Sequence, residues 1–150
     1  MSEVLALSIG VGLVVGLLFT EFFGISSGGL VVPGYIALFL DRPMDIIVTF
    51  LVAFLAFSIV RVMSLFLIVY GKRRTALMIL VGYLLGMLLK ENSSFFMNVD
   101  NSLSIIGFII PGLIATWMDR QGTVQTIAST LTIAIIVKLI IIMLGIEVVL

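Results

Sequence analysis

The chain has 150 residues, of which 62% are apolar and only 11% are charged, and its mean hydropathy is +1.39. Because a soluble domain carries about 25% charged residues, this composition predicts an integral membrane protein. The absence of cysteine and histidine excludes disulfides, thiol chemistry, imidazole bases and the usual zinc sites. Eight cationic residues balance eight acidic ones, so no net charge attracts nucleic acid.

Apolar runs separated by short polar or glycine-rich breaks fill the chain. In chain order they cover residues 4–20, 25–40, 44–70, 76–89, 105–118 and 124–150. A membrane-spanning helix needs about 20 apolar residues, which the first, third and last runs supply. The second and fifth runs are shorter, and a Pro-Gly pair interrupts each of them. The sequence therefore predicts an all-α integral membrane protein with a single membrane domain over residues 1–150.

The two interrupted runs belong to an internal repeat. Residues 29–42 and 107–120 share the pattern G-x-β-β-P-G-x-I-A-x-x-x-D-R, in which β is Val or Ile, at a constant offset of 78 residues. We therefore predict two similar halves, approximately 1–72 and 75–150, each with a helix, a broken segment and a long helix. If the broken segments cross the membrane, there are six spans in inverted halves. If they are re-entrant, there are four spans plus two re-entrant segments.

The Pro-Gly pairs, Pro33-Gly34 and Pro111-Gly112, are candidate polyanion-binding positions. Proline lacks a backbone N–H and suits the first turn of a helix, so we predict that each proline begins a half-helix. The amino-terminal ends of half-helices inside a membrane favour negatively charged groups, and interrupted segments at matching places in two halves are typical of transport sites. A kink that only serves packing is an equally good interpretation.

Small residues at spacings that allow close helix packing occur in the first and fourth runs. They are Gly10, Gly12, Gly16, Gly82 and Gly86.

Two cations, Arg61 and Lys138, lie inside long apolar runs. A cation near the bilayer centre costs about 2.5–3.5 kcal/mol on insertion scales, and such residues are usually functional or paired. One hypothesis is that they form a cationic lining for an anionic solute or polymer. The other is an ion pair with Glu21, with Asp100 or with an acid of a partner.

Other charged residues lie in the polar breaks between the apolar runs. Lys72, Arg73 and Arg74 form the only dense basic loop, which predicts a cytoplasmic position and a docking surface for a partner. Asp41-Arg42 and Asp119-Arg120 recur in the repeat. We expect them at the membrane surface, as pairs that contribute little to stability.

Three stretches of the chain carry a resemblance to a known family. They are Ser27-Gly-Gly-Leu-Val-Val-Pro-Gly-Tyr35, Tyr70-Gly-Lys-Arg-Arg74, and Ile109-Ile-Pro-Gly-Leu-Ile-Ala115 together with Gln121-Gly122. Their order and spacing resemble PgsC, also called CapC, the small membrane subunit of bacterial poly-γ-glutamate synthase. The resemblance covers nearly the whole chain. One mild departure is Gly-Lys-Arg-Arg where Gly-Arg-Arg is expected.

The resemblance implies a complex in the bacterial cell membrane. A cytoplasmic ATP-dependent amide ligase of the PgsB or CapB type joins glutamates through their γ-carboxylates, and an extracytoplasmic subunit of the PgsA or CapA type completes it. The product, poly-γ-glutamate, is a polyanion that must cross the lipid bilayer. Because this sequence has neither a phosphate-loop motif nor an acidic cluster suited to Mg²⁺, we predict no catalytic site, metal or cofactor of its own.

Three functions remain as hypotheses. The leading one is a non-catalytic, multi-pass membrane subunit that docks the ligase and assists the outward passage of the polymer. The second is a scaffold that only anchors and activates the ligase. The third, which the resemblance disfavours, is an independent transporter of small organic anions. Assembly into a homo-oligomer is compatible with each.

Overall fold

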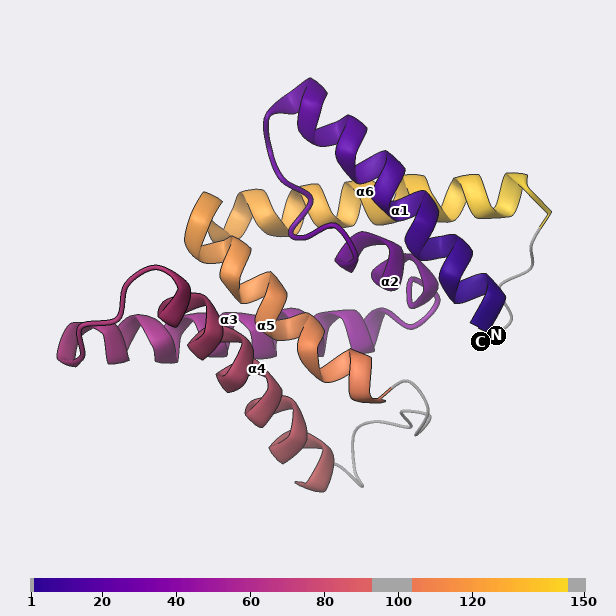
Figure 1. Ribbon diagram of the computed structural model, residues 1–150. Helices are drawn as coiled ribbons and strands as arrows, with labels where there is room; N and C mark the ends of the chain where they lie inside the picture. Colours follow the sequence, from indigo (N-terminus) through magenta and orange to yellow (C-terminus); the bar gives the residue numbers. More distant parts are fainter. Residues whose placement is uncertain (1, 93–103, 146–150) are drawn as a thin grey trace.

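The computed structural model describes residues 2–92 and 104–145, and the regular structure within them is entirely helical. The elements are α1 (Ser2–Phe23), α2 (Val32–Leu38), α3 (Pro43–Phe66), α4 (Lys72–Asn92), α5 (Ser104–Gln121) and α6 (Thr123–Met143) (Figure 1). The predicted all-α fold class is therefore confirmed.

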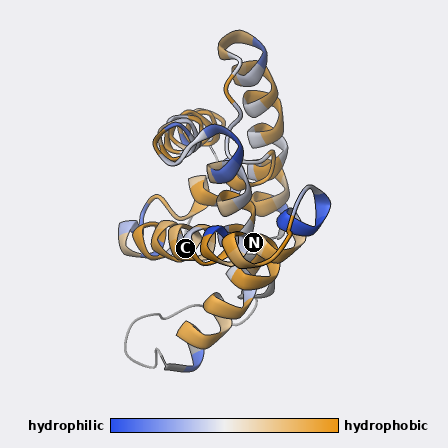
Figure 2. Ribbon diagram, turned by 90° about the vertical axis from the view of Figure 1, so that its left-hand side faces the viewer, coloured by the Kyte–Doolittle hydropathy of each residue, from blue (hydrophilic) through white to orange (hydrophobic). Residues whose placement is uncertain are grey.

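Three of these helices have the length and apolar composition needed to cross a membrane, namely Glu3–Phe23, Pro43–Phe66 and Thr123–Met143. Their outer faces expose large apolar side chains such as Val14, Leu51 and Leu139. In Figure 2, apolar colouring covers most of the helical ribbon, whereas polar residues are concentrated at a few helix ends and turns. Such a surface is suited to lipid, in agreement with the predicted membrane protein.

The second apolar run is broken, as its Pro-Gly pair predicts. After α1 the chain forms an irregular loop over residues 24–31, and the seven-residue α2 then begins with Pro33 in its first turn. Every residue of α2 is buried, and the helix packs against α1 and α6 and touches α5. Irregular backbone at membrane depth is tolerated when protein surrounds it. In this loop Ser27, Gly28 and Gly29 are buried, whereas Leu30 and Val31 are exposed.

The prediction that Pro111 begins a half-helix is wrong. Pro111 lies inside α5, which is helical on both sides of it. A proline inside a helix is tolerated in membrane proteins when neighbouring helices pack around it, and α5 packs against α3, α4 and α6. The repeat motif therefore adopts two different local structures, a helix start in one half and a continuous helix in the other.

Both Pro-Gly pairs lie where two helix backbones come very close together. A Cβ atom built on Gly12 of α1 would lie 2.8 Å from the Cα atom of Gly34, and one on Gly82 of α4 would lie 2.7 Å from the Cα atom of Gly112. Only glycine permits such an approach. The predicted role of small residues in close helix packing is thus confirmed at Gly12 and Gly82.

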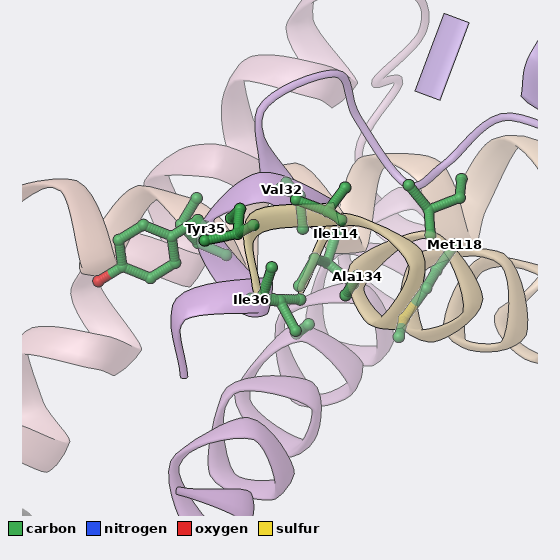
Figure 3. Close-up of a cluster of buried hydrophobic side chains, with 12 residues drawn as sticks. Val32, Tyr35, Ile36, Ile114, Met118 and Ala134 are labelled. Carbon is green, nitrogen blue, oxygen red and sulfur yellow. The ribbon is translucent and has the colours of Figure 1, made fainter. Parts of the chain in front are cut away.

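The main hydrophobic core forms where α2, α5 and α6 meet. Figure 3 shows Val32, Tyr35 and Ile36 of α2 beside Ile114 and Met118 of α5 and Ala134 of α6. A second cluster, composed of Ala56, Val60, Met78 and Ala115, joins α3, α4 and α5. The two clusters place α5 at the centre of the molecule.

The helix ends gather at two sides of the molecule (Figure 1). On the left of that view, α3 ends and α4 begins, and α5 ends beside the start of α6. The starts of α1 and α3 and the ends of α4 and α6 lie to the right. From α3 to α6, successive helices therefore run in alternating directions, whereas α1 and α3 start on the same side.

Replacement of Gly12 by Ala tests the close contact between α1 and α2. The added methyl group would overlap the Gly34 backbone, so we expect Gly12→Ala to destabilise the protein by about 1–3 kcal/mol. The control is Gly10→Ala in the same helix, since a Cβ atom there meets nothing within 4 Å. Thermal unfolding in detergent should give a lower midpoint for Gly12→Ala alone. Equal midpoints for the two variants would contradict the contact.

Candidate functional site

A pocket rich in positive charge lies between the start of α4 and the end of α5. Its volume is about 490 Å³, and we call it the basic pocket. The residues that line it are Gly71, Lys72, Arg74, Thr75, Met78, Thr116, Asp119 and Arg120. Two sets of residues that the sequence singled out separately, the basic loop and the second Asp-Arg pair, thus meet at one site.

The Arg74 side chain connects α4 to α5 inside this pocket. Its Nη2 atom donates a hydrogen bond of 2.5 Å to Oδ1 of Asp119, and the two side chains are only 25% and 23% exposed. The sequence predicts a surface pair at Asp119-Arg120, but Asp119 pairs with Arg74, which lies 45 residues away in the sequence. The Arg120 guanidinium instead lies 5.4 Å from the ring centroid of Trp117.

Unlike its two basic neighbours, Arg73 lies outside the basic pocket. It is exposed, and it does not line the basic pocket. The basic loop therefore provides two cations to the pocket, Lys72 and Arg74, and one to the surrounding surface.

A second ion pair joins the two predicted halves. Lys138 of α6 donates a hydrogen bond from Nζ to Oδ1 of Asp41, which follows α2. Glu21 is not its partner, and Asp100, the other acid considered, lies outside the described residues. The partner is Asp41 because α2 packs against α6 and thereby brings its own carboxyl end to that helix. The Lys138 side chain is 20% exposed and that of Asp41 is 57% exposed.

The structure does not bring Arg61 and Lys138 together. Arg61 is exposed on α3, and its guanidinium lies 5.7 Å from the ring centroid of Phe57 in the same helix. The main packing partners of α3 are α4 and α5, whereas α6 packs against α1, α2 and α5. The two cations thus lie on separate parts of the molecule.

The Pro-Gly pairs are buried in helix contacts. Pro33 and Gly34 pack between α1 and the core, and Gly112 contacts the backbone of α4 at Ile79. Pro111 also lines a small apolar cavity of about 100 Å³ between α2, α3, α4 and α5. These positions favour a packing role for the Pro-Gly pairs.

A partly buried cluster of hydrogen bonds holds the loop that precedes α2. The Ser26 N–H donates to Oε1 of Gln121 at 3.0 Å, and Nε2 of Gln121 donates to the Ser26 carbonyl at 2.8 Å. The hydroxyl of Ser129 donates to the same carbonyl at 2.9 Å, and that of Thr130 donates to the Ser27 carbonyl at 2.9 Å. We call these contacts the loop clamp.

Motifs and composition did not identify the loop clamp, although the spacing of three hydroxyl residues carries a signal for it. Thr126, Ser129 and Thr130 follow the i, i+3, i+4 spacing of one helix face within an apolar run. All three are buried, and buried hydroxyls need hydrogen-bond partners. The loop residues Ser26 and Ser27 are distant from them in sequence, so the spacing alone could not identify the contacts.

Comparison with known proteins gives the family. The model of the family described as "Capsule biosynthesis CapC" matches residues 11–127, which include both repeat motifs, the basic pocket and Gln121. The chain belongs to the CapC family. The resemblance stated from the sequence is thus confirmed.

Two members of the CapC family are similar to this chain over most of their length. The chain is 36% identical to "PGA biosynthesis protein CapC" of Bacillus subtilis (strain 168) over 124 residues, which is 82% of this chain and 83% of that protein. It is 35% identical to "Capsule biosynthesis protein CapC" of Bacillus anthracis over 131 residues, 87% of this chain and 88% of that protein. No solved structure matches the chain.

Proposed function

We propose that this chain is a multi-pass subunit of a capsule-forming poly-γ-glutamate synthase in the bacterial cell membrane. In this proposal it docks the cytoplasmic amide ligase, of the CapB type, and assists the passage of the polyanion. Its membership of the CapC family and the names of its relatives support a role in capsule or PGA biosynthesis. The exposed apolar faces of its long helices support the membrane location.

The observation that carries the passage of the polymer is the ion pair between Lys138 and Asp41. Lys138 is mostly buried on a helix of membrane-spanning length, whereas the carboxylate that compensates it is more than half exposed. A carboxylate of the polymer can replace that of Asp41 without leaving Lys138 unpaired, because the two groups are chemically alike. This exchange avoids the large cost of an uncompensated buried charge.

The two ion pairs lie near opposite ends of α6. Asp119, paired with Arg74, precedes the first residue of α6 by four positions. Lys138 follows Thr123 by 15 positions, or roughly 22 Å along the helix axis. A polyanion that passes along α6 would therefore meet Lys138 at a different depth of the membrane from the basic pocket. Pro33, Gly34, Pro111 and Gly112 shape the helix contacts beside this path, whereas Arg61 lies apart from it on α3.

Helices α1 and α3 start on the same side in Figure 1, so the chain between them, which includes α2, returns across the molecule, and α3 to α6 then alternate in direction. These directions support six crossings in two inverted halves. The ends of α3 and α5 lie on one side in Figure 1, and the start of α3 and the end of α6 lie on the other. Asp41 and Asp119, which correspond in the repeat, would then face opposite sides of the membrane. The basic loop belongs on the cytoplasmic side, so the ligase would dock there and the CapA-type subunit at the other face.

Charge neutralisation at position 138 tests polymer passage. We expect Lys138→Gln to lower surface polymer several-fold while ligase activity in membranes stays unchanged. Asp41→Asn is the matched control. It breaks the same pair but leaves the cation available to polymer carboxylates, so surface polymer should remain near the wild-type level.

If the pair only holds α2 against α6, both variants should lower the amount of folded protein and the surface polymer to the same extent. That result would support the scaffold alternative. Two observations favour this alternative: Lys138 already has a partner within the chain, and the Pro-Gly pairs are buried in helix contacts.

Docking of the ligase is tested at Arg73. Because this cation is exposed and outside the basic pocket, Arg73→Glu should leave folding intact. We expect it to reduce co-purification of the ligase by about 5-fold or more, because charge reversal at a complementary interface weakens the binding free energy by about 1 kcal/mol or more. Arg73→Lys keeps the charge and should retain the ligase. Undiminished co-purification with Arg73→Glu would move the docking surface elsewhere.

Cysteine labelling tests the membrane topology, and the natural chain contains no cysteine that would interfere. Met44 lies close to Asp41, Val124 lies close to Asp119, and both are exposed. In the inverted arrangement, Met44→Cys should react with an impermeant maleimide in intact cells, and Val124→Cys only after permeabilisation. Labelling of both from the same side would contradict it and favour re-entrant segments.

A further inference from the structure

We infer that the basic pocket binds the phosphate group of an anionic membrane phospholipid. This assignment goes beyond the proposed function, in which the neighbouring Arg73 serves the ligase. Its first basis is charge. The pocket is lined by Lys72, Arg74 and Arg120, whereas Asp119 is its only carboxylate among the residues that the structure describes. Since Asp119 is paired with Arg74, the positive charges of Lys72 and Arg120 are left for an anion.

The pocket also contains more hydrogen-bond donors than acceptors. The Nε atom of Arg74 is buried and has no hydrogen-bond partner in the described part of the chain. The 21-residue helix α4 begins at Lys72. The N–H groups of Arg74 and Thr75 donate to the Gly71 carbonyl, and those of Lys72 and Arg73 have no partners within the helix. A buried donor without an acceptor is costly. A phosphate group supplies several acceptor oxygens at once, which suit the accessible donors of Lys72 and Arg120.

The apolar surroundings of the pocket indicate that the phosphate belongs to a lipid. The segment that leads from α3 to Gly71 exposes large apolar side chains, with Phe66 at 84%, Ile68 at 85% and Tyr70 at 76%. These side chains suit the acyl region beside the pocket. Trp117, on which Arg120 lies, is a residue type enriched at the membrane–water boundary. The pocket thus lies where a headgroup would be found, and basic pockets between membrane helices bind such headgroups.

The volume of about 490 Å³ is large enough for a lipid headgroup. Acyl chains of the same lipid would extend along the exposed apolar segment. A free phosphate ion would use the cations and donors but would leave that apolar surface uncovered.

Native mass spectrometry of the purified full-length chain, with added phosphatidylglycerol, tests the assignment. A cation beside the lipid headgroup contributes about 1 kcal/mol to the binding of anionic lipid. Because Lys72 and Arg120 line the pocket, we expect about 5-fold weaker binding for Lys72→Gln or Arg120→Gln. The double variant should bind about 25-fold more weakly. Arg61→Gln with Arg73→Gln removes the same charge outside the pocket, and its lipid binding should equal that of the wild type.

Separate arms distinguish the sources of the anion. Glycerol 3-phosphate, which lacks acyl chains, should bind much more weakly than phosphatidylglycerol, and soluble poly-γ-glutamate should not displace the lipid. Equal binding of glycerol 3-phosphate, or displacement by the polymer that depends on Lys72 and Arg120, would overturn the lipid assignment. Undiminished lipid binding by both single variants would overturn it as well, and these variants remain informative if the double variant fails to fold.

Discussion

The need to pair every backbone polar group away from water governs this structure. The long helices meet it internally, apart from the one bond that Pro111 cannot donate within α5, but the loop before α2 cannot. Gln121, Ser129 and Thr130 provide the missing partners for Ser26 and Ser27. The broken segment is thereby placed inside the protein, where α2 completes the core with α5 and α6. The loop clamp thus explains how a membrane protein accommodates a helix of only seven residues.

The end of α5 connects the functional parts of the molecule. Three consecutive residues act on three different neighbours: Asp119 pairs with Arg74 of α4, Arg120 lines the basic pocket, and Gln121 holds the loop before α2. A change of ligand in the pocket would therefore act on the same helix end that positions the broken segment. The end of α5 thus contacts both the basic pocket and the loop before α2.

Composition and hydropathy predicted the all-α fold, and Pro33 predicted the start of α2. The same reasoning failed at Pro111, because local sequence does not reveal that α4 packs closely enough at Gly82 and Gly112 to support a continuous helix. The charged residues were identified correctly as candidates, but their partners were not. Arg74 with Asp119 and Lys138 with Asp41 are 45 and 97 residues apart, and only the packing of helices brings them together.

The loop clamp also has a consequence for biosynthesis. The hydroxyls that satisfy Ser26 and Ser27 belong to residues 103 positions later in the chain. A ribosome therefore delivers the interrupted segment to the membrane long before its hydrogen-bonding partners exist. Until α6 is inserted, the peptide groups of Ser26 and Ser27 need other hydrogen-bond partners, such as the insertion machinery or interfacial water. The loop before α2 therefore reaches its final hydrogen bonding only after α6 has been inserted.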